Sequence, residues 1–186
     1  LIGLVGSEMC IRDRYNGYED IKKGKINFIG NPEKRIKEDY LRILRYLRFF
    51  LNYSKQPHDP KIVKVLKMNL MGITNLSKER LIDELRKTLK PNVLESLSKD
   101  KTILEIFVSV FPQLKHFNIF SKLNTNLKDT LSKVDFIFII SLLIIDETDN
   151  VEYFIYKFNL SKKDQKRIRN ISDFYKKKIT SKTFTE

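Results

Sequence analysis

Apolar side chains recur at helical spacing between residues 33 and 52. At 100° per residue, one stripe is formed by Ile36, Tyr40, Ile43, Leu44, Leu47 and Leu51. A stripe of this kind must face a core, so the pattern predicts one helix over residues 33–52. A second face of that helix would carry Arg35, Asp39, Arg42 and Tyr46, within about 60° of one another.

The chain after residue 52 is also predicted to be helical. The whole sequence has only 6 glycines and 5 prolines, which favours long helices over many tight turns. After a turn at 56–60, a second helix is expected over 61–70. Its inward side chains would be Ile62, Val65, Leu66 and Met68. Ser77 is expected to cap a third helix, which Pro91 stops.

Three further segments complete an all-α prediction. Residues 103–111 are rich in β-branched and aromatic side chains, so a strand is possible by propensity, but the helical neighbours favour a short buried helix. Residues 134–145 are almost wholly apolar, yet they fall short of the roughly 20 residues that span a bilayer, so a buried helix is expected. Ser161 and Asp164 open a last, basic helix that runs to about Lys178.

Positive charge gathers toward both ends of the chain, whose formal net charge is +13. Residues 15–90 carry 18 basic and 9 acidic side chains, residues 91–160 carry 7 and 9, and residues 161–186 carry 9 and 3. Basic ends around a neutral middle suit an RNA backbone that touches the protein in two places. A lysine-rich composition encoded by an AT-rich genome would give the same charge without RNA, so that alternative stays open.

The charged face of the first predicted helix also has two interpretations. Opposite charges at i, i+3 and i+4 commonly form a solvated face, with ion pairs worth about 0.2–0.5 kcal/mol each. Alternatively, the carboxylate of Asp39 and the guanidinium of Arg42 could offer a nucleotide the acceptor and donors that a partner base offers. Spacing alone favours the solvated face.

Three motifs in order favour the nucleotide interpretation by resemblance. Residues 30–36, followed by Glu38, Asp39 and Arg42, resemble the neck of class II tRNA nucleotidyltransferases, the CCA-adding enzymes, whose architecture bacterial poly(A) polymerases share. Upstream, Gly17 and Asp20 resemble the connector between the catalytic head and the neck. Downstream, residues 77–85 resemble a helix that buttresses the base-reading helix, with Glu79, Arg80 and Glu84 as its motif residues. The resemblance covers residues 15 to about 90.

The resemblance implies a role for each residue of the first motif. Asp39 and Arg42 would bond the base edge of CTP or ATP, and Glu38 would hold them in position. Arg35 and Tyr46 share their face and are further nucleotide candidates, with simple packing as the alternative for Tyr46. The candidate RNA contacts are Arg45, Arg48, Lys176, Lys177 and Lys178.

Residues 1–14 are expected not to be native. Residues 4–14 read as the translation of a transposon-based sequencing-library adapter, through ATG TGT ATA AGA GAC AG, and such a segment is excluded from fold reasoning. The single cysteine, Cys10, lies within it and therefore gives no evidence about disulfides, zinc or catalysis.

The resemblance also implies a domain organisation. Residues 15–30 would be the end of the head and the head–neck connector, residues 31–90 the neck that binds the base and RNA, and residues 91–186 a helical body truncated at its C-terminus. The catalytic α/β head would precede the connector and lie outside this chain. No Gly-rich phosphate loop or Asp-x-Asp pair follows a strand pattern in the sequence.

The predicted function is therefore part of an enzyme that adds CMP and AMP to the tRNA 3′ end. Mg²⁺ would be bound by the head, so the chain alone is expected to be inactive, with no metal ligand or catalytic residue of its own. Expected partners are tRNA, CTP and ATP, without DNA or membrane, in the cytoplasm; the oligomeric state stays open. The alternatives are a poly(A) polymerase, an A-only or CC-only adding enzyme, or a stand-alone helical RNA-binding module.

Overall fold

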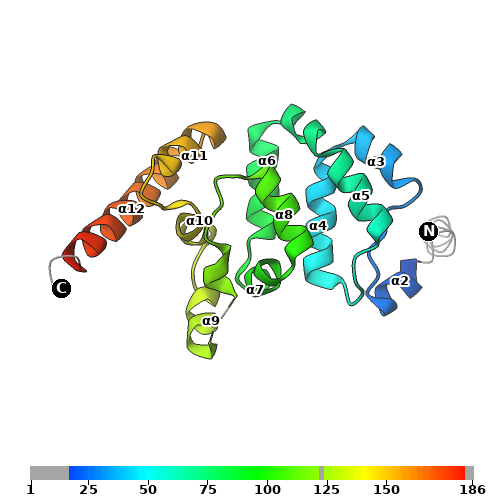
Figure 1. Cartoon of the computed structure of the whole chain (residues 1–186), viewed down its shortest axis with the longest axis horizontal. Coiled ribbons are helices and arrows are strands. Elements are labelled where there is room, and N and C mark those ends of the chain that lie inside the picture. The colour runs from blue at the N-terminus through cyan, green and yellow to red at the C-terminus, as the bar shows by residue number, and fades with distance from the viewer. Residues whose placement is uncertain (1–16, 122–123, 183–186) are drawn as a thin grey trace, which may run out of the picture. The chain divides into compact units, whose positions relative to one another are not determined.

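The computed structural model describes residues 17–121 and 124–182, and within these ranges every regular element is a helix (Figure 1). The all-α prediction is thereby confirmed for the described part of the chain. Residues 1–14, which were predicted to be an adapter translation, lie outside it. The chain divides after Thr74 into two compact units. The boundaries predicted at residues 30 and 90 from the family resemblance stay predictions.

The first unit contains α2, α3, α4, α5 and all but the last residue of the 3₁₀ helix η1. Their bounds are Gly17–Lys23, Pro32–Glu38, Leu41–Tyr53, Pro60–Met68 and Leu70–Asn75. Two of these helices begin in the same way, with a polar cap followed by a proline. Asn31 Oδ1 accepts a hydrogen bond from the Lys34 amide at 2.9 Å, and Asp59 Oδ1 accepts one from the Lys61 amide at 2.8 Å. A proline in the first turn costs no hydrogen bond, because the first amides of a helix have no partner within it.

The prediction of one helix over residues 33–52 was wrong, because the chain breaks at Asp39. Its backbone is extended, with φ −155° and ψ 104°, so α3 ends before it and α4 begins after it. Asp39 Oδ1 accepts a hydrogen bond from the Leu41 amide at 3.1 Å. A short acidic side chain competes in this way for backbone amides and favours helix ends over helix interiors.

The apolar stripe survives the break. Its buried members are Ile36 in α3 and Ile43, Leu44 and Leu47 in α4, while Tyr40 and Leu51 are half-buried. In α5, Ile62 and Leu66 are buried as predicted. Met68 is 68% exposed, which corrects its predicted inward position. Two positions beyond Leu66, it falls on the opposite side of the helix.

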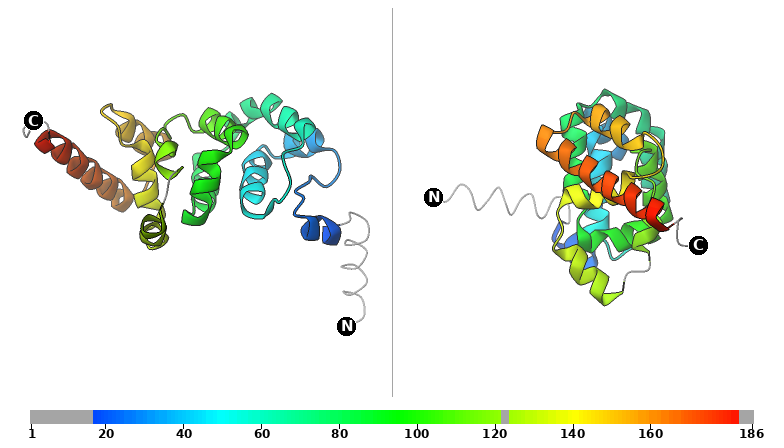
Figure 2. Two further views of the ribbon diagram at one scale, coloured as in Figure 1. Left: turned by 60° about the horizontal axis from the view of Figure 1, so that its bottom comes forward. Right: turned by 90° about the vertical axis from the view of Figure 1, so that its left-hand side faces the viewer.

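The second unit contains seven α-helices and the 3₁₀ helix η2 in its described residues. The α-helices, α6 to α12, span Lys78–Thr88, Pro91–Lys99, Lys101–Val110, Thr125–Ser132, Phe136–Ile144, Asn150–Phe158 and Lys162–Lys182, and η2 spans Phe117–Phe120. The predicted caps are confirmed, since Ser77 Oγ accepts from the Arg80 amide and Ser161 Oγ from the Asp164 amide. Figure 2 shows α12 as a long continuous rod.

The core of the second unit is built around α10 and a group of phenylalanines. Seven of the nine residues of α10 are buried, as predicted for this apolar segment, and its one hydroxyl, Ser141 Oγ, donates to the Ile137 carbonyl at 2.7 Å. The predicted short buried helix over 103–111 is α8, whose Phe107 ring lies 5.2 Å from that of Phe111. None of the described helices is long and apolar enough to cross a bilayer.

Candidate functional site

Glu38 joins two arginines of the first motif. Its Oε2 atom lies 2.8 Å from Nη1 of Arg35 and 2.7 Å from Nη1 of Arg42. Arg42 Nη1 also donates to the backbone carbonyl of Arg35 at 2.8 Å. The hydrogen bond from Arg42 is the largest cause that lowers the pKa of Glu38, and the charge of Arg35 adds to it. Glu38 therefore stays ionised and fixes one edge of the Arg42 guanidinium.

A pocket of about 260 Å³ opens beside this network. Three arginines line it, Arg35, Arg42 and Arg45, together with the aromatic rings of Phe28, Tyr46 and Phe49. The volume is just below the range of about 300–1,000 Å³ typical of small-molecule sites, so the pocket suits a small group such as a single base. Guanidinium groups beside aromatic rings favour a planar or anionic ligand.

Tyr46 contributes to this pocket from a buried position. Its side chain is 4% exposed, and the Phe28 ring lies parallel to it, with centroids 5.5 Å apart and planes 10° apart. The Phe50 ring is 5.9 Å away. Of the two roles considered for Tyr46, this geometry favours packing over an open stacking surface, because Phe28 covers one face of the ring.

Asp39 is not among the residues that line the pocket. It is half-buried in the break between α3 and α4, where the Leu41 amide fixes one of its oxygens. Arg48, a predicted RNA contact, is also outside the lining, and its guanidinium lies 4.5 Å from the centre of the Phe49 ring. The structure thus brings Arg35, Arg42, Arg45 and Tyr46 around one cavity and leaves Asp39 and Arg48 outside it.

The connector folds back beside α4, which the sequence did not reveal. Asp20 Oδ2 accepts a hydrogen bond from Asn27 Nδ2 at 3.2 Å, and the Lys55 amide donates to the Gly24 carbonyl at 2.9 Å. Gly24 has φ +60°, and a Cβ atom there would lie 2.7 Å from the Lys55 side chain, so only glycine fits. Phe28 reaches the pocket from this connector, as do Asn27 and Ile29. No motif marked these three residues, because their proximity to Arg42 depends on the fold.

The remaining candidate residues lie in the second unit. In α6, Glu79 and Arg80 are exposed, whereas Glu84 is 1% exposed. Their predicted role in supporting the base-reading helix stays a prediction. Lys176, Lys177 and Lys178 are exposed on α12, and Lys178 Nζ lies 6.0 Å from the centre of the Phe174 ring. At the start of α2, Gly17 is half-buried.

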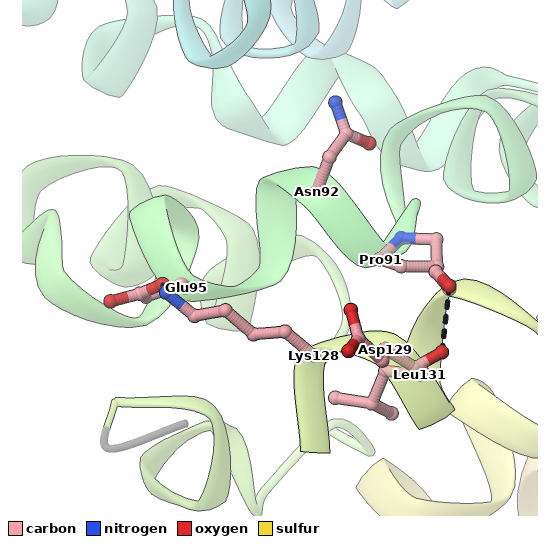
Figure 3. A pocket seen from close by; sticks show the side chains of 7 residues that line it. Pro91, Asn92, Glu95, Lys128, Asp129 and Leu131 are labelled. Carbon is pink, nitrogen blue, oxygen red and sulfur yellow. Dashed lines mark hydrogen bonds and ion pairs between the residues drawn. The ribbon is translucent and has the colours of Figure 1, made fainter. Parts of the chain in front are cut away.

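Figure 3 shows a second cavity, of about 480 Å³, between α7 and α9. Glu95 and Lys128 point toward each other across it, with Oε2 and Nζ 2.6 Å apart. Lys99 Nζ lies 2.6 Å from the other Glu95 oxygen. Hydrogen bonds from Lys128 and Lys99 lower the pKa of Glu95 to about 2. The opposite charges are matched within the protein here, so this cavity has less to attract a nucleotide than the arginine-lined one.

Within residues 17–121 and 124–182, no three His, Cys, Asp or Glu side chains are grouped closely enough to hold a metal ion.

Comparisons with known proteins agree with the motif resemblance. No family model matches the chain. It is 41% identical over 95 residues to CCA tRNA nucleotidyltransferase 1, mitochondrial, of Homo sapiens, a match that covers 50% of this chain and 22% of that protein. It is 27% identical over 163 residues to the CCA-adding enzyme of Staphylococcus saprophyticus, covering 87% of this chain and 38% of that protein.

Poly(A) polymerase I of Haemophilus influenzae is 28% identical over 110 residues, covering 58% of this chain and 24% of that protein. The chain therefore spans about a fifth to two fifths of the length of the curated relatives it matches. Over that part, the chain is similar to CCA tRNA nucleotidyltransferases and poly(A) polymerases, as its motifs predicted.

Proposed function

We propose that this chain is the neck and body part of a tRNA nucleotidyltransferase that adds CMP and AMP to the tRNA 3′ end. Within that enzyme it would select the incoming nucleotide and bind tRNA. The similarity to CCA-adding enzymes supports the reaction. The observation that carries the role of this chain is the Arg42 guanidinium, held by Glu38 and the Arg35 carbonyl at the wall of a base-sized pocket.

Arg42 would supply the donors of the base reader. A guanidinium carries five N–H groups, and the bonds to Glu38 and the Arg35 carbonyl both start from Nη1. Donors on Nε and Nη2 would pair with the ring acceptors of cytosine or adenine. Because Nη1 is fixed on two sides, the plane of the guanidinium is set before the nucleotide arrives.

Asp39 does not line the pocket. In this proposal its carboxylate would accept from the exocyclic amine, shared by cytosine and adenine, of a base that extends past Arg42 toward the break between α3 and α4. A carboxylate has about four lone-pair positions, so the bond from the Leu41 amide is compatible with this role. Uracil and guanine present the opposite polarity at these positions. They would leave polar groups of the site unpaired, which is the usual basis of strong rejection.

The chemistry would take place outside this chain. As the resemblance implies, we assign Mg²⁺ and phosphoryl transfer to a head domain. The roles of Arg35 as a nucleotide contact, and of Arg45, Arg48 and the α12 lysines as RNA contacts, belong to the same proposal. So do a cytoplasmic location and tRNA rather than DNA as the nucleic acid.

The test begins with the reading frame upstream of Gly17. A full-length protein with a head domain should incorporate labelled CMP and AMP into tRNA that lacks its 3′ end. Arg42→Ala should lower the selectivity for CTP and ATP over UTP and GTP by about 10–100-fold, since a good bidentate base contact is worth about 1–3 kcal/mol. Binding of tRNA should hardly change.

Lys64→Ala removes an exposed cation of α5 and serves as the control. It should leave nucleotide selectivity unchanged. If Arg42→Ala keeps full selectivity and lowers only the affinity for tRNA, Arg42 is a phosphate contact and α4 is not the base reader.

A poly(A) polymerase is the second candidate, favoured by the similarity to poly(A) polymerase I. The product of the same assay separates the two. Addition that stops after CCA supports the first proposal, whereas a long tail made from ATP alone supports the second. An intact gene without any head domain would instead support a stand-alone RNA-binding module.

A further inference from the structure

The Tyr40 ring lies directly on the backbone of Gly72. A Cβ atom placed on Gly72 would be 2.1 Å from Cε1 of Tyr40 and 2.2 Å from its Cδ1, closer than any real contact. The φ of Gly72 lies outside the left-handed region, so backbone conformation alone does not require glycine there. What requires glycine at this position is the space taken by the ring.

The segment that carries Gly72 has little freedom to move away. The Gly72 amide donates to the Asn69 carbonyl at 3.1 Å, and Asn69 Nδ2 donates to the Val65 carbonyl in α5 at 2.8 Å. The next residue, Ile73, is 4% exposed and anchors η1 in the core. Any added volume at Gly72 must therefore be accommodated mainly by Tyr40.

Tyr40 in turn sits at the break between α3 and α4. It follows the extended residue Asp39 and precedes Leu41, which is 4% exposed. The Leu41 amide bonds Asp39 Oδ1, and the Arg42 amide bonds the Asp39 carbonyl at 3.0 Å. The Ile43 amide also bonds the Tyr40 carbonyl at 3.1 Å. Tyr40 and Asp39 are thus joined through one short, hydrogen-bonded stretch of backbone at the start of α4.

We infer that Tyr40 and Gly72 are positioning residues for nucleotide selection, which act through Asp39. The ring seated on Gly72 fixes where the chain leaves α3, and so fixes the direction of the Asp39 carboxylate relative to Arg42. This inference rests on the proposed function. It assigns specificity to a contact that touches neither the nucleotide nor the pocket.

The selectivity test is a double-mutant cycle in the full-length protein. A misplacement of about 1 Å in a reacting or reading group can cost up to about 100-fold, so Gly72→Ala should lower the ratio of kcat/KM for CTP over UTP by about tenfold. Tyr40→Leu should lower it by a similar factor, because the shorter side chain leaves the space over Gly72 unfilled. The double variant should return to within about threefold of the wild type, since the added methyl group then has room.

Two variants control for other causes. Tyr40→Phe keeps the ring and should keep the selectivity. Met71→Ala removes a 79% exposed side chain from the same 3₁₀ helix and should also have no effect. The inference would be overturned if the double variant lost as much selectivity as the two single variants combined. It would also be overturned if Gly72→Ala kept full selectivity.

Amide hydrogen exchange on the 186-residue chain separates this inference from the proposed function. Gly72→Ala should speed exchange at Leu41 and Arg42, whose amides bond Asp39, and the double variant should restore protection. Unchanged exchange refutes the coupling, whatever the enzyme assay gives. Faster exchange with unchanged selectivity refutes the positioning role. If the wild-type enzyme does not select CTP over UTP, the proposed function is wrong. The positioning role of Tyr40 is then wrong as well.

Discussion

Glu38 and Arg42 form an ion pair across the break between two helices, with Oε2 and Nη1 2.7 Å apart. Their spacing is that of an ordinary i, i+4 pair within one helix. Here the pair joins the last residue of α3 to the first turn of α4, and Arg35 adds a second cation to the same oxygen. The pair therefore constrains both the angle between α3 and α4 and the orientation of the Arg42 guanidinium.

The first prediction concerns this pair. Glu38→Gln removes the charge and weakens the hold on Arg42, so the selectivity of the full-length protein for CTP over UTP should fall by about two- to fivefold, the scale of one partly exposed ion pair. Glu33→Gln is the matched control, because Glu33 pairs with Lys37 on the same helix at 2.6 Å. Equal effects of both variants on the kcat/KM ratio would show that Glu38 acts only through the stability of α3.

A second prediction concerns the core of the second unit. Phe107→Ala removes a fully buried ring that lies 5.2 Å from Phe111 and 6.2 Å from Phe117. The free energy of unfolding should fall by about 3–5 kcal/mol, from lost burial plus the cavity left behind. Phe174→Ala removes a ring that is 68% exposed and should change it by less than about 0.5 kcal/mol. Urea denaturation measures both, and equal losses would contradict the assigned core.

Helix positions could largely be predicted from the sequence, because apolar periodicity and capping side chains are visible within a short stretch of it. Ser77 and Ser161 cap the helices they were expected to cap, and the apolar segment before Asp146 is buried in α10. The break at Asp39 could not be predicted from periodicity, since the apolar stripe keeps its register on both sides of it. At the break, the Asp39 side chain accepts a hydrogen bond from the Leu41 amide, an interaction that apolar periodicity does not report.

The candidate site was predictable only in part. The resemblance placed Glu38 in the motif with Arg42, and the structure joins Glu38 to Arg42 and Arg35. Helical spacing had placed Asp39 on the same face as Arg42, but the break at Asp39 leaves it outside the pocket lining. Phe28 and Phe49 complete the pocket, but Phe28 comes from a connector whose return toward α4 depends on Gly24 and Lys55. A contact between segments that are distant in sequence leaves no periodic signal.

A third prediction concerns pH. The pKa of Glu95 is lowered from 4.5 to about 2, first by the hydrogen bond from Lys128 and then by that from Lys99. Between these pH values the unfolded chain binds a proton that the folded chain does not. Glu95 therefore stabilises the fold fully above about pH 4.5, and this contribution is lost as the pH falls toward 2.

Glu95→Gln should accordingly flatten the dependence of the urea midpoint on pH between 2 and 5, with the largest difference at low salt because the pairs are partly exposed. Glu147→Gln is the control. Glu147 is exposed, and it is the neighbouring Asp146 that pairs with Lys115. A Glu95→Gln variant with the wild-type slope would show that Lys128 and Lys99 do not hold this carboxylate in solution.

The last prediction concerns RNA binding by the chain itself, which should bind tRNA and transfer no nucleotide to it. Lys177 and Lys178 are exposed on α12, and their joint replacement by alanine should lower the slope of log affinity against log salt by about 2, one unit per phosphate contact. Lys176 is left in place because its charge also acts on Glu152.

The matched control replaces Lys101 and Lys133, two exposed lysines of the neutral middle of the chain. It removes the same charge, so equal slope changes in both double variants would show that tRNA responds to net charge and not to an α12 surface. A change confined to the Lys177 and Lys178 variant places a phosphate contact on α12. Incorporation of labelled CMP by the unmodified chain would contradict the assignment of the chemistry to a head domain.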